Sequence, residues 1–528
     1  MPCTSECDDA AAAPVRAAVL LPAGRSRVWQ ERAALALAGL PGVQCRVVRV
    51  RAAPREHDAQ WRRWAAAHPE LQELRVDDES DAAALADAAG ARDAAGVWDA
   101  VIDLADVADP APWRARSRFG VWQPLDAQGL HLAAPYAGHA SIVSGRGGEL
   151  SLVRDGATAL ETMRYYADPD YPRALGRAYL GLLYLLAAGL LELVHGGEPA
   201  AAAFVAQAPR SRWRRLVAGL RGRWRSQLRR WRGQWLSESW MIGVVDAPIE
   251  QTLQGRFAER IRWLGGRDAL QYRADPFGLP GQDRLLYCET YDYRDGVGRL
   301  ERLRLDADGA VAQADPAGPQ RPGHVSYPYV FEHAGQTYAI PETAQRRCCE
   351  LYEIDAHGRW RFVATLLDDV AAADASLFAW EGRFWLAYTD LSWGAFDNLC
   401  LSYADDLRGP WRRHARHPVK LDHRSSRPAG TPFVHDGALY RPAQDCTGGY
   451  GQAVALNRVR LCTPQRYRED VVTHCRPDPR GRNPHGLHTV SAWGARTLVD
   501  GKRYVFNLHE LGRKLRRRYG AAAQTVGV

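Results

Sequence analysis

Residues 327–342 read YPYVFEHAGQTYAIPE, two strand-like runs around a glycine. Phe331 is followed four residues later by Gly335 and seven residues later by a second aromatic residue. The same spacing recurs in DASLFAWEGRFWLAYT (374–389) and in AGTPFVHDGALYRPAQD (429–445). A tight turn with positive φ favours glycine, so each stretch predicts a strand, a turn and a return strand.

Two looser copies extend this repeat. DPFGLPGQDRLLYCE (275–289) has Asp283 in the glycine position, and VSAWGARTLVDGKRYVF (490–506) supplies a fifth copy. The copies are spaced widely enough for one four-stranded blade each. We therefore predict an all-β, five-bladed β-propeller over residues 240–508. A β-sandwich with fortuitous repeats is the alternative.

The N-terminal part of the chain has a different pattern. Apolar, strand-like runs at 15–21, 43–50 and 99–106 alternate with helical spacing, as at 27–40. Strands separated by helices predict a parallel sheet, so we expect a Rossmann-type α/β domain with a helical extension over 15–200. The turn after the first strand, PAGRSR, lacks the glycine spacing of a dinucleotide-binding or phosphate-binding loop, so neither ligand is predicted there.

The composition is that of a globular protein with local basicity. The 528 residues suffice for two or three domains, and 46% of them are hydrophobic. Residues 210–232 contain ten arginines, more than the whole net charge of +8. The ten cysteines form no CxxC pair, which predicts reduced thiols. Residues 1–14 carry acids where an export signal is basic, so we expect a disordered N-terminus and a cytoplasmic protein.

Two further segments carry predictions about membranes. Residues 178–191 are apolar but about six residues short of a bilayer span, which predicts a buried helix. Residues 205–238 place tryptophans and leucines on one helical face and arginines on the rest, which predicts a basic amphipathic linker helix. It is either a connector or a contact, through 210–236, with the inner face of an anionic plasma membrane. Its aromatic residues are not interleaved for base stacking, so no nucleic-acid partner is expected. The tail 509–528 is also basic.

Acids begin two equivalent hairpins of the repeat. Asp275 in ADPF and Asp374 in ADASLF lie where the innermost strand of a blade faces the central channel. Two carboxylates at one pocket suit base chemistry on a sugar hydroxyl. Glu342 is a third catalytic candidate, and Glu289 and Asp445 are candidates for substrate binding. Ion pairing with nearby arginines is the alternative for these last three.

Basic residues gather around the fourth and fifth copies. Arg424, Arg427 and Arg441 present forked guanidinium groups that suit a phosphate, and ordinary ion pairs in a solvated loop are the alternative. His488 begins the fifth copy and is a further candidate for substrate binding. A single channel histidine is more often packed through hydrogen bonds than bound to a metal, so no metal is predicted.

The repeat region resembles a known family. The runs SYPYVFEHAGQTYAIPET, DDVAAADASLFAWEGRFW, HPVKLDHRSSRPAG, ALYRPAQDC and QAVALNRV resemble the N-terminal region of plant glucosamine inositolphosphorylceramide transferases, which bacterial proteins also carry. That region is similar to the five-bladed propellers of glycosidases such as arabinanases and β-xylosidases. The resemblance covers about 240–505. In bacterial members a formyltransferase-like domain precedes the propeller, and DAVIDLAD and RSRFGVWQPL match that weaker pattern.

This resemblance implies roles for some residues. Asp275 matches the catalytic base of the glycosidases, and Asp374 matches the acid that tunes its pKa and orients the substrate. Their general acid has no counterpart in SRPAG (426–430). Losing it should cost on the order of 10²–10⁴ in hydrolysis, whereas a nucleotide-sugar donor leaves as a phosphate that cations stabilise. The formyltransferase-like domain lacks an SLHPS-like segment, so we expect it to be degenerate and without a cofactor.

Three functions follow as hypotheses. The first is a glycosyltransferase of bacterial surface polysaccharide or glycolipid biosynthesis, which transfers a sugar from a nucleotide sugar to a glycan or lipid-linked acceptor with Asp275 as base. The second is a glycoside hydrolase of the five-bladed propeller type with a relocated acid. The third is a non-catalytic carbohydrate-binding propeller.

Overall fold

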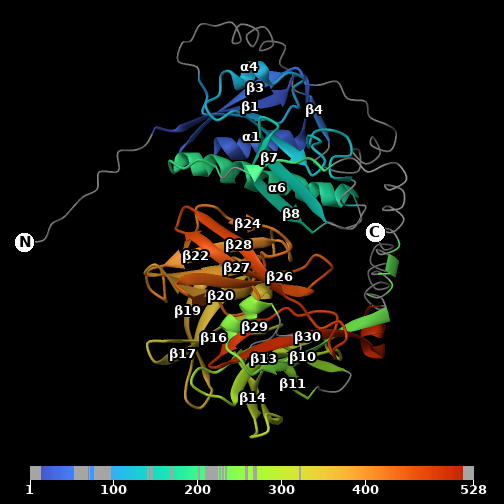
Figure 1. Ribbon diagram of the computed structural model, residues 1–528, viewed down its shortest axis with the longest axis vertical. Coiled ribbons are helices and arrows are strands. Elements are labelled where there is room, and N and C mark those ends of the chain that lie inside the picture. The colour runs from blue at the N-terminus through green and yellow to red at the C-terminus, as the bar shows by residue number, and fades with distance from the viewer. Residues whose placement is uncertain are drawn as a thin grey trace, which may run out of the picture. The chain divides into compact units, whose positions relative to one another are not determined.

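The computed structural model describes residues 13–52, 69, 72–75, 97–139, 142, 147–166, 171–199, 202–207, 224, 227–228, 231, 233, 235–255, 260–265, 270–319 and 323–514 (Figure 1). The chain divides into two compact units, residues 1–223 and residues 224–528. Nearly all of the N-terminal segment predicted as disordered, 1–14, lies outside the described residues.

The first unit contains a seven-stranded sheet in the order β3-β1-β5-β6-β7-β8-β9. Its first half is parallel: β1 (Val15–Pro22) pairs with β3 (Val43–Val50) and β5 (Ala100–Asp103), and β5 pairs with β6 (Val121–Asp126). Helix α1 (Val28–Ala38) connects β1 to β3. The almost wholly buried β1 is what a parallel strand needs, because both of its faces are covered.

The second half of this sheet is antiparallel, so the prediction of a parallel sheet is wrong there. Strand β6 pairs with β7 (Gly148–Arg154), β7 with β8 (Thr158–Tyr165), and β8 with β9 (Ala202–Ala203). Asp155 and Gly156 both have positive φ and connect β7 to β8 through a turn that only antiparallel strands can use. The formyltransferase likeness of this unit stays a prediction. The remaining short elements are β2 (Arg25–Arg27), β4 (Glu73–Arg75) and α4 (Ala111–Arg114).

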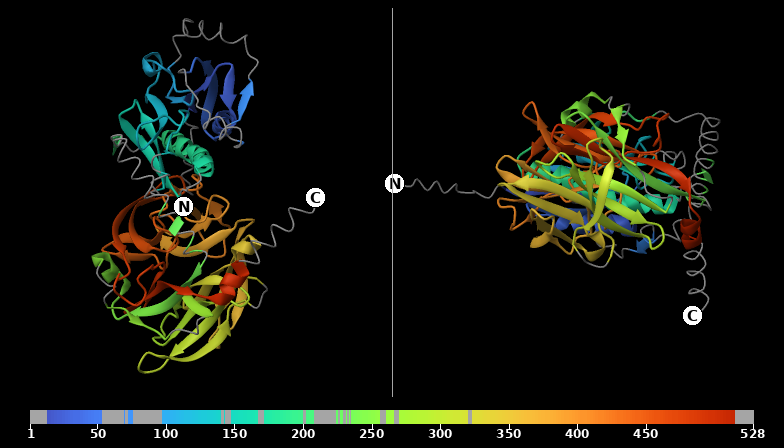
Figure 2. Two further views of the ribbon diagram at one scale, coloured as in Figure 1. Left: turned by 90° about the vertical axis from the view of Figure 1, so that its right-hand side faces the viewer. Right: turned by 90° about the horizontal axis from the view of Figure 1, so that it is seen from below.

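A long apolar helix, α6 (Tyr171–Val194), packs on this sheet. It contacts β7, β8 and α1, and Figure 2 shows it along one face of the strands. The predicted helix over 178–191 is confirmed, but α6 is longer than the uncharged run. Ala174–Val194 has a mean hydropathy of 1.6 and could cross a membrane by length and composition alone, yet 72% of that window is buried inside the protein. Gly189 lets it approach β6, because a Cβ there would lie 2.8 Å from the Trp122 ring.

The second unit contains five antiparallel sheets, four of four strands and one of five, and this confirms the five-bladed β-propeller (Figure 1). Each blade is named below by its strands. The blades are β11-β10-β30-β29, β12–β15, β16–β19, β20–β23 and β25–β28, and β24 pairs with β22. The strands are β10 (Leu236–Val245), β11 (Arg262–Trp263), β12 (Gln271–Gly278), β13 (Leu285–Asp292), β14 (Val297–Leu305), β15 (Val311–Ala317), β16 (Ser326–His333), β17 (Gln336–Glu342), β18 (Cys348–Ile354), β19 (Trp360–Asp368), β20 (Ala372–Trp380), β21 (Arg383–Asp390), β22 (Asn398–Ala404), β23 (Arg412–Arg413), β24 (Lys420–Leu421), β25 (Phe433–His435), β26 (Ala438–Asp445), β27 (Ala453–Cys462), β28 (Tyr467–Cys475), β29 (Val490–Trp493) and β30 (Arg496–Phe506). The short 3-10 helices are η2 (Ile249–Gln254) and η4 (Ala344–Arg346).

All five predicted repeats are hairpins between two successive strands of one blade. Gly335, Gly382 and Gly437 have φ between +68° and +76°, and the residue before each also has positive φ. Two successive residues with positive φ match the twist of a tight hairpin. Asp283 does not take the glycine position: the left-handed residue of its loop is Gly281, at φ +69°.

The first and last strands of the propeller lie in the same blade. Strand β10 pairs with β30 over ten residues, from Leu236 with Phe506 to Val245 with Thr497. This pairing joins the two ends of the propeller sequence, and no local sequence pattern predicts it. Apolar side chains of successive blades pack together, as in the cluster of Phe277, Tyr329 and Leu377.

The predicted linker helix is described only in part, because residues 208–223, 225–226, 229–230, 232 and 234 lie outside the described residues. Trp224, Leu228, Trp231 and Trp235 are helical, and all four are exposed, Trp224 by 68%. The helix ends before the predicted residue 238, because β10 begins at Leu236. In the basic tail, residues 508–514 are helical and 515–528 lie outside the described residues.

Candidate active site in the propeller

A shared backbone irregularity positions the two predicted aspartates. Asp275 and Asp374 have φ of +50° and +52°, and the pairing register of each hairpin shifts at that point. Tyr327 in the blade between them has φ +43° at the same kind of shift. Positive φ is costly for residues other than glycine, by roughly 1–3 kcal/mol, and such strain concentrates at functional sites. Both aspartates are buried.

Asp374 is held by partners from two other blades. Its Oδ2 accepts hydrogen bonds from Nε of Arg427 at 2.6 Å and from Nε2 of Gln444 at 2.7 Å. Its backbone N–H donates to Oε2 of Glu342 at 3.1 Å. Arg427 also donates to the carbonyl oxygen of Ala395 and lies over the ring of Tyr450. The loop before β25 therefore brings a cation to the acids.

Two glutamates from neighbouring blades complete a carboxylate cluster. Burial raises the pKa of Glu342 to about 8, together with the nearby charge of Asp374 and against the lowering effect of Arg427. Burial also raises the pKa of Glu289 well above its usual range, and the charges of Asp275 and Glu342 add to this. A buried carboxyl near like charges keeps its proton to a higher pH than a free carboxyl does. The carboxylate cluster, defined as Asp275, Glu289, Glu342 and Asp374, thus holds groups suited to proton transfer near neutrality.

Asp275 lies at one end of a buried chain of charges. Nε2 of His488 is 3.1 Å from its Oδ1, and Nδ1 of His488 is 2.7 Å from Oδ2 of Asp500. Thr489 donates a hydrogen bond to the same Oδ1 at 2.7 Å. Burial lowers the pKa of His488, but Asp500 and Asp275 outweigh this effect and raise it to about 10. The structure therefore fixes Asp275 against an imidazolium cation.

Asp275, His488 and Asp500 also meet the spacing of a metal site. Their ligand atoms lie within 4.8 Å of one another. A metal takes one neutral nitrogen of an imidazole, whereas both nitrogens of His488 face carboxylates and its raised pKa keeps it protonated at neutral pH. These residues fit an ion-pair chain better than a metal centre.

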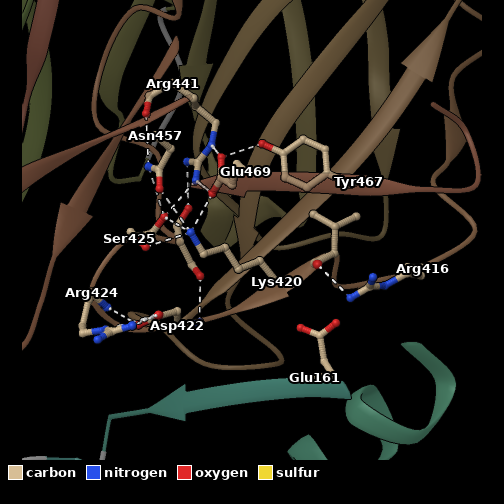
Figure 3. A network of polar contacts seen from close by, with 12 residues as sticks. Glu161, Arg416, Lys420, Asp422, Arg424, Ser425, Arg441, Asn457, Tyr467 and Glu469 are labelled. Carbon is tan, nitrogen blue, oxygen red and sulfur yellow. Dashed lines mark hydrogen bonds and ion pairs between the residues drawn. The ribbon is translucent and has the colours of Figure 1, made fainter. Parts of the chain in front are cut away.

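Two of the predicted phosphate-binding arginines are paired elsewhere. Arg441 is buried and donates to both oxygens of Glu469, at 3.0 and 2.6 Å, as Figure 3 shows. Burial raises the pKa of Glu469, but Arg441 and Lys420 outweigh this effect and lower it to about 2. Arg424 donates to both oxygens of Asp422 (Figure 3). Of the three arginines, Arg427 is the one that contacts the carboxylate cluster.

Asp445 also lies apart from the carboxylate cluster. Its Oδ1 accepts hydrogen bonds from the backbone and hydroxyl of Thr447, and its Oδ2 is 3.8 Å from Nε2 of His474. It begins the glycine-rich loop that carries Tyr450. Its predicted role in substrate binding stays a prediction.

A family comparison bears on this propeller. Residues 308–500 match the family model described as the N-terminal region of glucosamine inositolphosphorylceramide transferase 1. The matched range contains Glu342, Asp374, Arg427 and His488, whereas Asp275 and Glu289 precede it. The family region therefore includes most of the site.

Proteins of this name are also similar to the chain. Glucosamine inositolphosphorylceramide transferase 1 of Oryza sativa subsp. indica is 29% identical over 202 residues, 37% of this chain and 27% of that protein. The Arabidopsis thaliana protein of the same name is 27% identical over 220 residues, 40% of this chain and 29% of that protein. The match thus spans little more than a quarter of these relatives.

Solved structures of glycoside hydrolases also align with the chain. The family 117 glycoside hydrolase Zg3597 of Zobellia galactanivorans is 14% identical, covers 45% of this chain and 88% of its own, and has a TM-score of 0.32. The α-L-arabinofuranosidase of Lactobacillus brevis is 12% identical, covers 46% and 87%, and has the same TM-score. The assignment of the propeller rests on the five sheets described above.

Sequence reasoning missed several polar residues around the carboxylate cluster. Asp500 accepts the backbone N–H groups of Asp275, His488 and Thr489, yet it stands in LVDGKR, where Asp-Gly resembles a turn. It lies instead inside the long strand β30. Gln444 was overlooked beside Asp445, although the alternation along β26 turns neighbours to opposite faces. That alternation is the signal that could have identified Gln444 as a site residue.

Proposed function

We propose that the propeller is a glycosyltransferase whose chemistry takes place at the carboxylate cluster. The observation that carries this proposal is the convergence of four buried or half-buried acids from three blades, with Arg427 and His488 as their cations. Buried acids with raised pKa values beside fixed cations are what proton transfer near neutral pH requires. The family match over 308–500 supports glycosyl transfer as the reaction class.

In this proposal Asp275 is the base on the acceptor hydroxyl. Its Oδ1 is held by Thr489 and His488, and among the described residues no hydrogen bond reaches its Oδ2. We assign that oxygen to the acceptor hydroxyl. Asp374, fixed by Arg427 and Gln444, serves as the orienting partner. Glu342, with its pKa of about 8, is the group best matched to exchanging a proton at neutral pH.

The donor in this proposal is a nucleotide sugar. The segment 426–430, where the glycosidases resembled above have their general acid, contributes Arg427 instead. A phosphate leaving group needs cationic stabilisation rather than a proton, which favours transfer. Arg424 and Arg441 pair with acids outside the carboxylate cluster, so we drop the three-arginine clamp. We assign the donor phosphates to Arg427 and His488, the cations that contact the cluster.

We further propose a glycan or lipid-linked acceptor, as in bacterial surface polysaccharide or glycolipid assembly. The names of the relatives, which describe transfer to inositolphosphorylceramide, support a glycolipid. A cytoplasmic protein, peripheral at the inner face of the plasma membrane, fits a lipid-linked acceptor. In this proposal the N-terminal unit, which we predicted to be formyltransferase-like, has no catalytic activity and serves in docking or donor recognition.

The test is turnover of nucleotide sugars with a lipid-linked acceptor. We expect Asp275→Asn to lower the rate by about 10²–10⁴, because the hydroxyl loses its base. The matched control is Asp283→Asn, an exposed aspartate in the hairpin loop of the same blade. Equal turnover by wild type and Asp275→Asn would refute the assignment.

Hydrolysis is the second candidate, and one observation favours it. Glu342 is protonated at neutral pH, so it could supply the proton that a sugar leaving group needs. Release of reducing sugar from arabinan-like or xylan-like oligosaccharides, lost in Glu342→Gln, would support a hydrolase. Oligosaccharide binding without turnover would instead support the carbohydrate-binding propeller.

A further inference from the structure

A tyrosine-lined pocket opens beside the carboxylate cluster. Its cavity volume is about 410 Å³, and its wall comes from β10, β12, β13, β30 and the helical residues 508–514. We call it the tyrosine pocket. Its lining includes Tyr272, Tyr291, Tyr293, Tyr504, Glu238 and Glu510.

Hydrogen bonds and stacking fix the rings of this pocket. Tyr272 and Tyr291 stack with centroids 5.1 Å apart and planes 13° apart, and Tyr293 meets both edge-on. The hydroxyl of Tyr293 donates to the carbonyl oxygen of Glu238, and Arg513 donates to the hydroxyl of Tyr291 at 2.7 Å. Because ring positions are set before a ligand binds, little side-chain entropy is lost on binding.

The tyrosine pocket lies next to Glu289 of the carboxylate cluster along one sheet face. Glu289 and Tyr291 are two residues apart on β13, so their side chains point to the same face at a step of about 7 Å, and Tyr293 follows in the turn after the strand. On β12, Ala274 lies opposite Glu289 and Tyr272 lies opposite Tyr291. After burial, the charge of Glu289 is the next largest cause of the raised pKa of Tyr272, which places the two side chains close together.

Charged groups lie at the edge of the aromatic wall. Nζ of Lys502 is 3.0 Å from Oε1 of Glu238 and lies over the ring of Trp240. Glu510 pairs with Arg513 at 2.8 Å. A second cavity of about 470 Å³ shares Gly448 and Tyr504 with the tyrosine pocket, and Lys502 lines it. Flat apolar faces therefore alternate with hydrogen-bonding groups.

We propose that the tyrosine pocket is a subsite for a pyranose ring of the substrate. A pyranose has an apolar C–H face that packs on an aromatic ring and a rim of hydroxyls that carboxylates and lysine can bind. The cavity volume is in the range of small-molecule sites. This inference rests on the proposed function, because it names the sugar subsite next to the carboxylates that act on it.

Binding can be tested without turnover. Ligand-observed NMR on the full chain, with glucose, mannose, glucosamine and N-acetylglucosamine as probes, should detect at least one of them. We expect Tyr272→Ala and Tyr504→Ala to weaken that binding by about fivefold to tenfold, and Tyr272→Phe to retain most of it because the ring remains. The matched control is Tyr440→Ala, since Tyr440 stacks on Phe433 in another blade with centroids 5.5 Å apart and does not line the pocket.

Several outcomes would overturn the inference. Absence of binding for all four sugars would do so, as would binding that Tyr272→Ala and Tyr504→Ala leave unchanged. Choline is the counter-probe, because an aromatic pocket with carboxylates can also hold a cation. If choline bound and the sugars did not, the pocket would be a cation site. Sugar binding without turnover would refute the proposed transferase alone, and turnover unaffected by the tyrosine variants would refute this subsite alone.

Discussion

At the scale of residues, the aspartates and the glutamates of the carboxylate cluster have different charged neighbours. Asp374 and Asp275 each have a cation in contact, Arg427 and His488. Among the described residues no arginine or lysine forms an ion pair with Glu342 or Glu289, and Nε2 of His324 lies 3.7 Å from Oε1 of Glu289. Burial, and then the negative charge of the aspartates, therefore raises the pKa values of both glutamates. Two carboxyl groups that hold protons lie beside two that are fixed by cations.

The raised pKa of Glu342 makes stability depend on pH. The folded state holds the Glu342 proton up to about pH 8, whereas the unfolded chain releases it near pH 4.5. Its contribution to stability is therefore fully present below pH 4.5 and is lost as the pH rises through 8. We expect Glu342→Gln to flatten this decline. Urea unfolding across this pH range measures the effect.

The control for this prediction is Glu332→Gln. Glu332 is an exposed glutamate on β16, the strand paired with β17. That variant should keep the wild-type decline of unfolding free energy with pH. If Glu342→Gln and wild type showed the same decline, Glu342 would not carry the raised pKa.

Sequence could predict the acids of this site but not their surroundings. Asp275 and Asp374 were found because they occupy the same position in two copies of a repeat. Arg427 and His488 were found by their residue type, although which acid each contacts depends on the closed ring of blades. Asp500 is not predictable as a site residue, because the sequence Asp-Gly resembles a turn. Gly501 is instead required by packing, since a Cβ there would lie 2.2 Å from the Trp263 ring.

At the scale of elements, the hairpins were predictable because their signals are local. An aromatic residue, a glycine and a second aromatic residue specify each turn and both flanking strands. The outer strands carry no such pattern, and neither the pairing of β10 with β30 nor the contact of Arg441 with Glu469 follows from spacing. In the first unit the same limit applied, because alternating strands and helices did not reveal the antiparallel half of the sheet.

One glycine at a contact between blades supports a prediction about stability. Gly430 has φ +118°, and a Cβ there would lie 1.9 Å from the carbonyl oxygen of Val490. It pairs with Val490 in a parallel bridge, and its N–H donates to the hydroxyl of Tyr327 at 2.6 Å. We expect Gly430→Ala to destabilise the propeller by about 3 kcal/mol or more, because backbone strain and a clash with backbone add. Denaturant unfolding measures the loss.

Gly437→Ala is the control for this glycine. Gly437 also has positive φ, at +68°, but no atom lies within 4 Å of the position of its Cβ. Backbone strain alone should cost about 1 kcal/mol there. If Gly430→Ala lowered the free energy of unfolding no more than Gly437→Ala does, the contact between Gly430 and Val490 would accommodate the added methyl group without cost.

At the scale of the whole molecule, the chain joins two compact units through an arginine-rich segment. The boundary between the units, at residues 223 and 224, lies within that segment. The family match covers only part of the second unit, and the curated relatives are aligned over little more than a quarter of their length. The function of the linker therefore has to be argued from its own residues.

The linker supports a prediction of membrane binding. Trp224, Trp231 and Trp235 are exposed by 68%, 57% and 42%, which is unusual for large aromatic residues. Arginines between them would each add about 1 kcal/mol of attraction near an anionic surface. The full chain should therefore float with liposomes that contain anionic lipid, and added salt should weaken the binding. Two variants should lose this binding: one with the arginines of 221–232 changed to glutamine, and one with these three tryptophans changed to serine.

The charge-matched control changes six exposed arginines of the propeller to glutamine, so that net charge alone cannot explain a loss. These are Arg359, Arg361, Arg383, Arg408, Arg412 and Arg413. If both six-arginine variants lost binding equally, the attraction would be a property of overall charge. If the tryptophan variant still floated, the apolar face would not enter the interface, and the segment would be only a connector. Loss in the linker variants alone, with transfer to a soluble acceptor unchanged, would assign the linker to bringing the propeller to a lipid-linked acceptor.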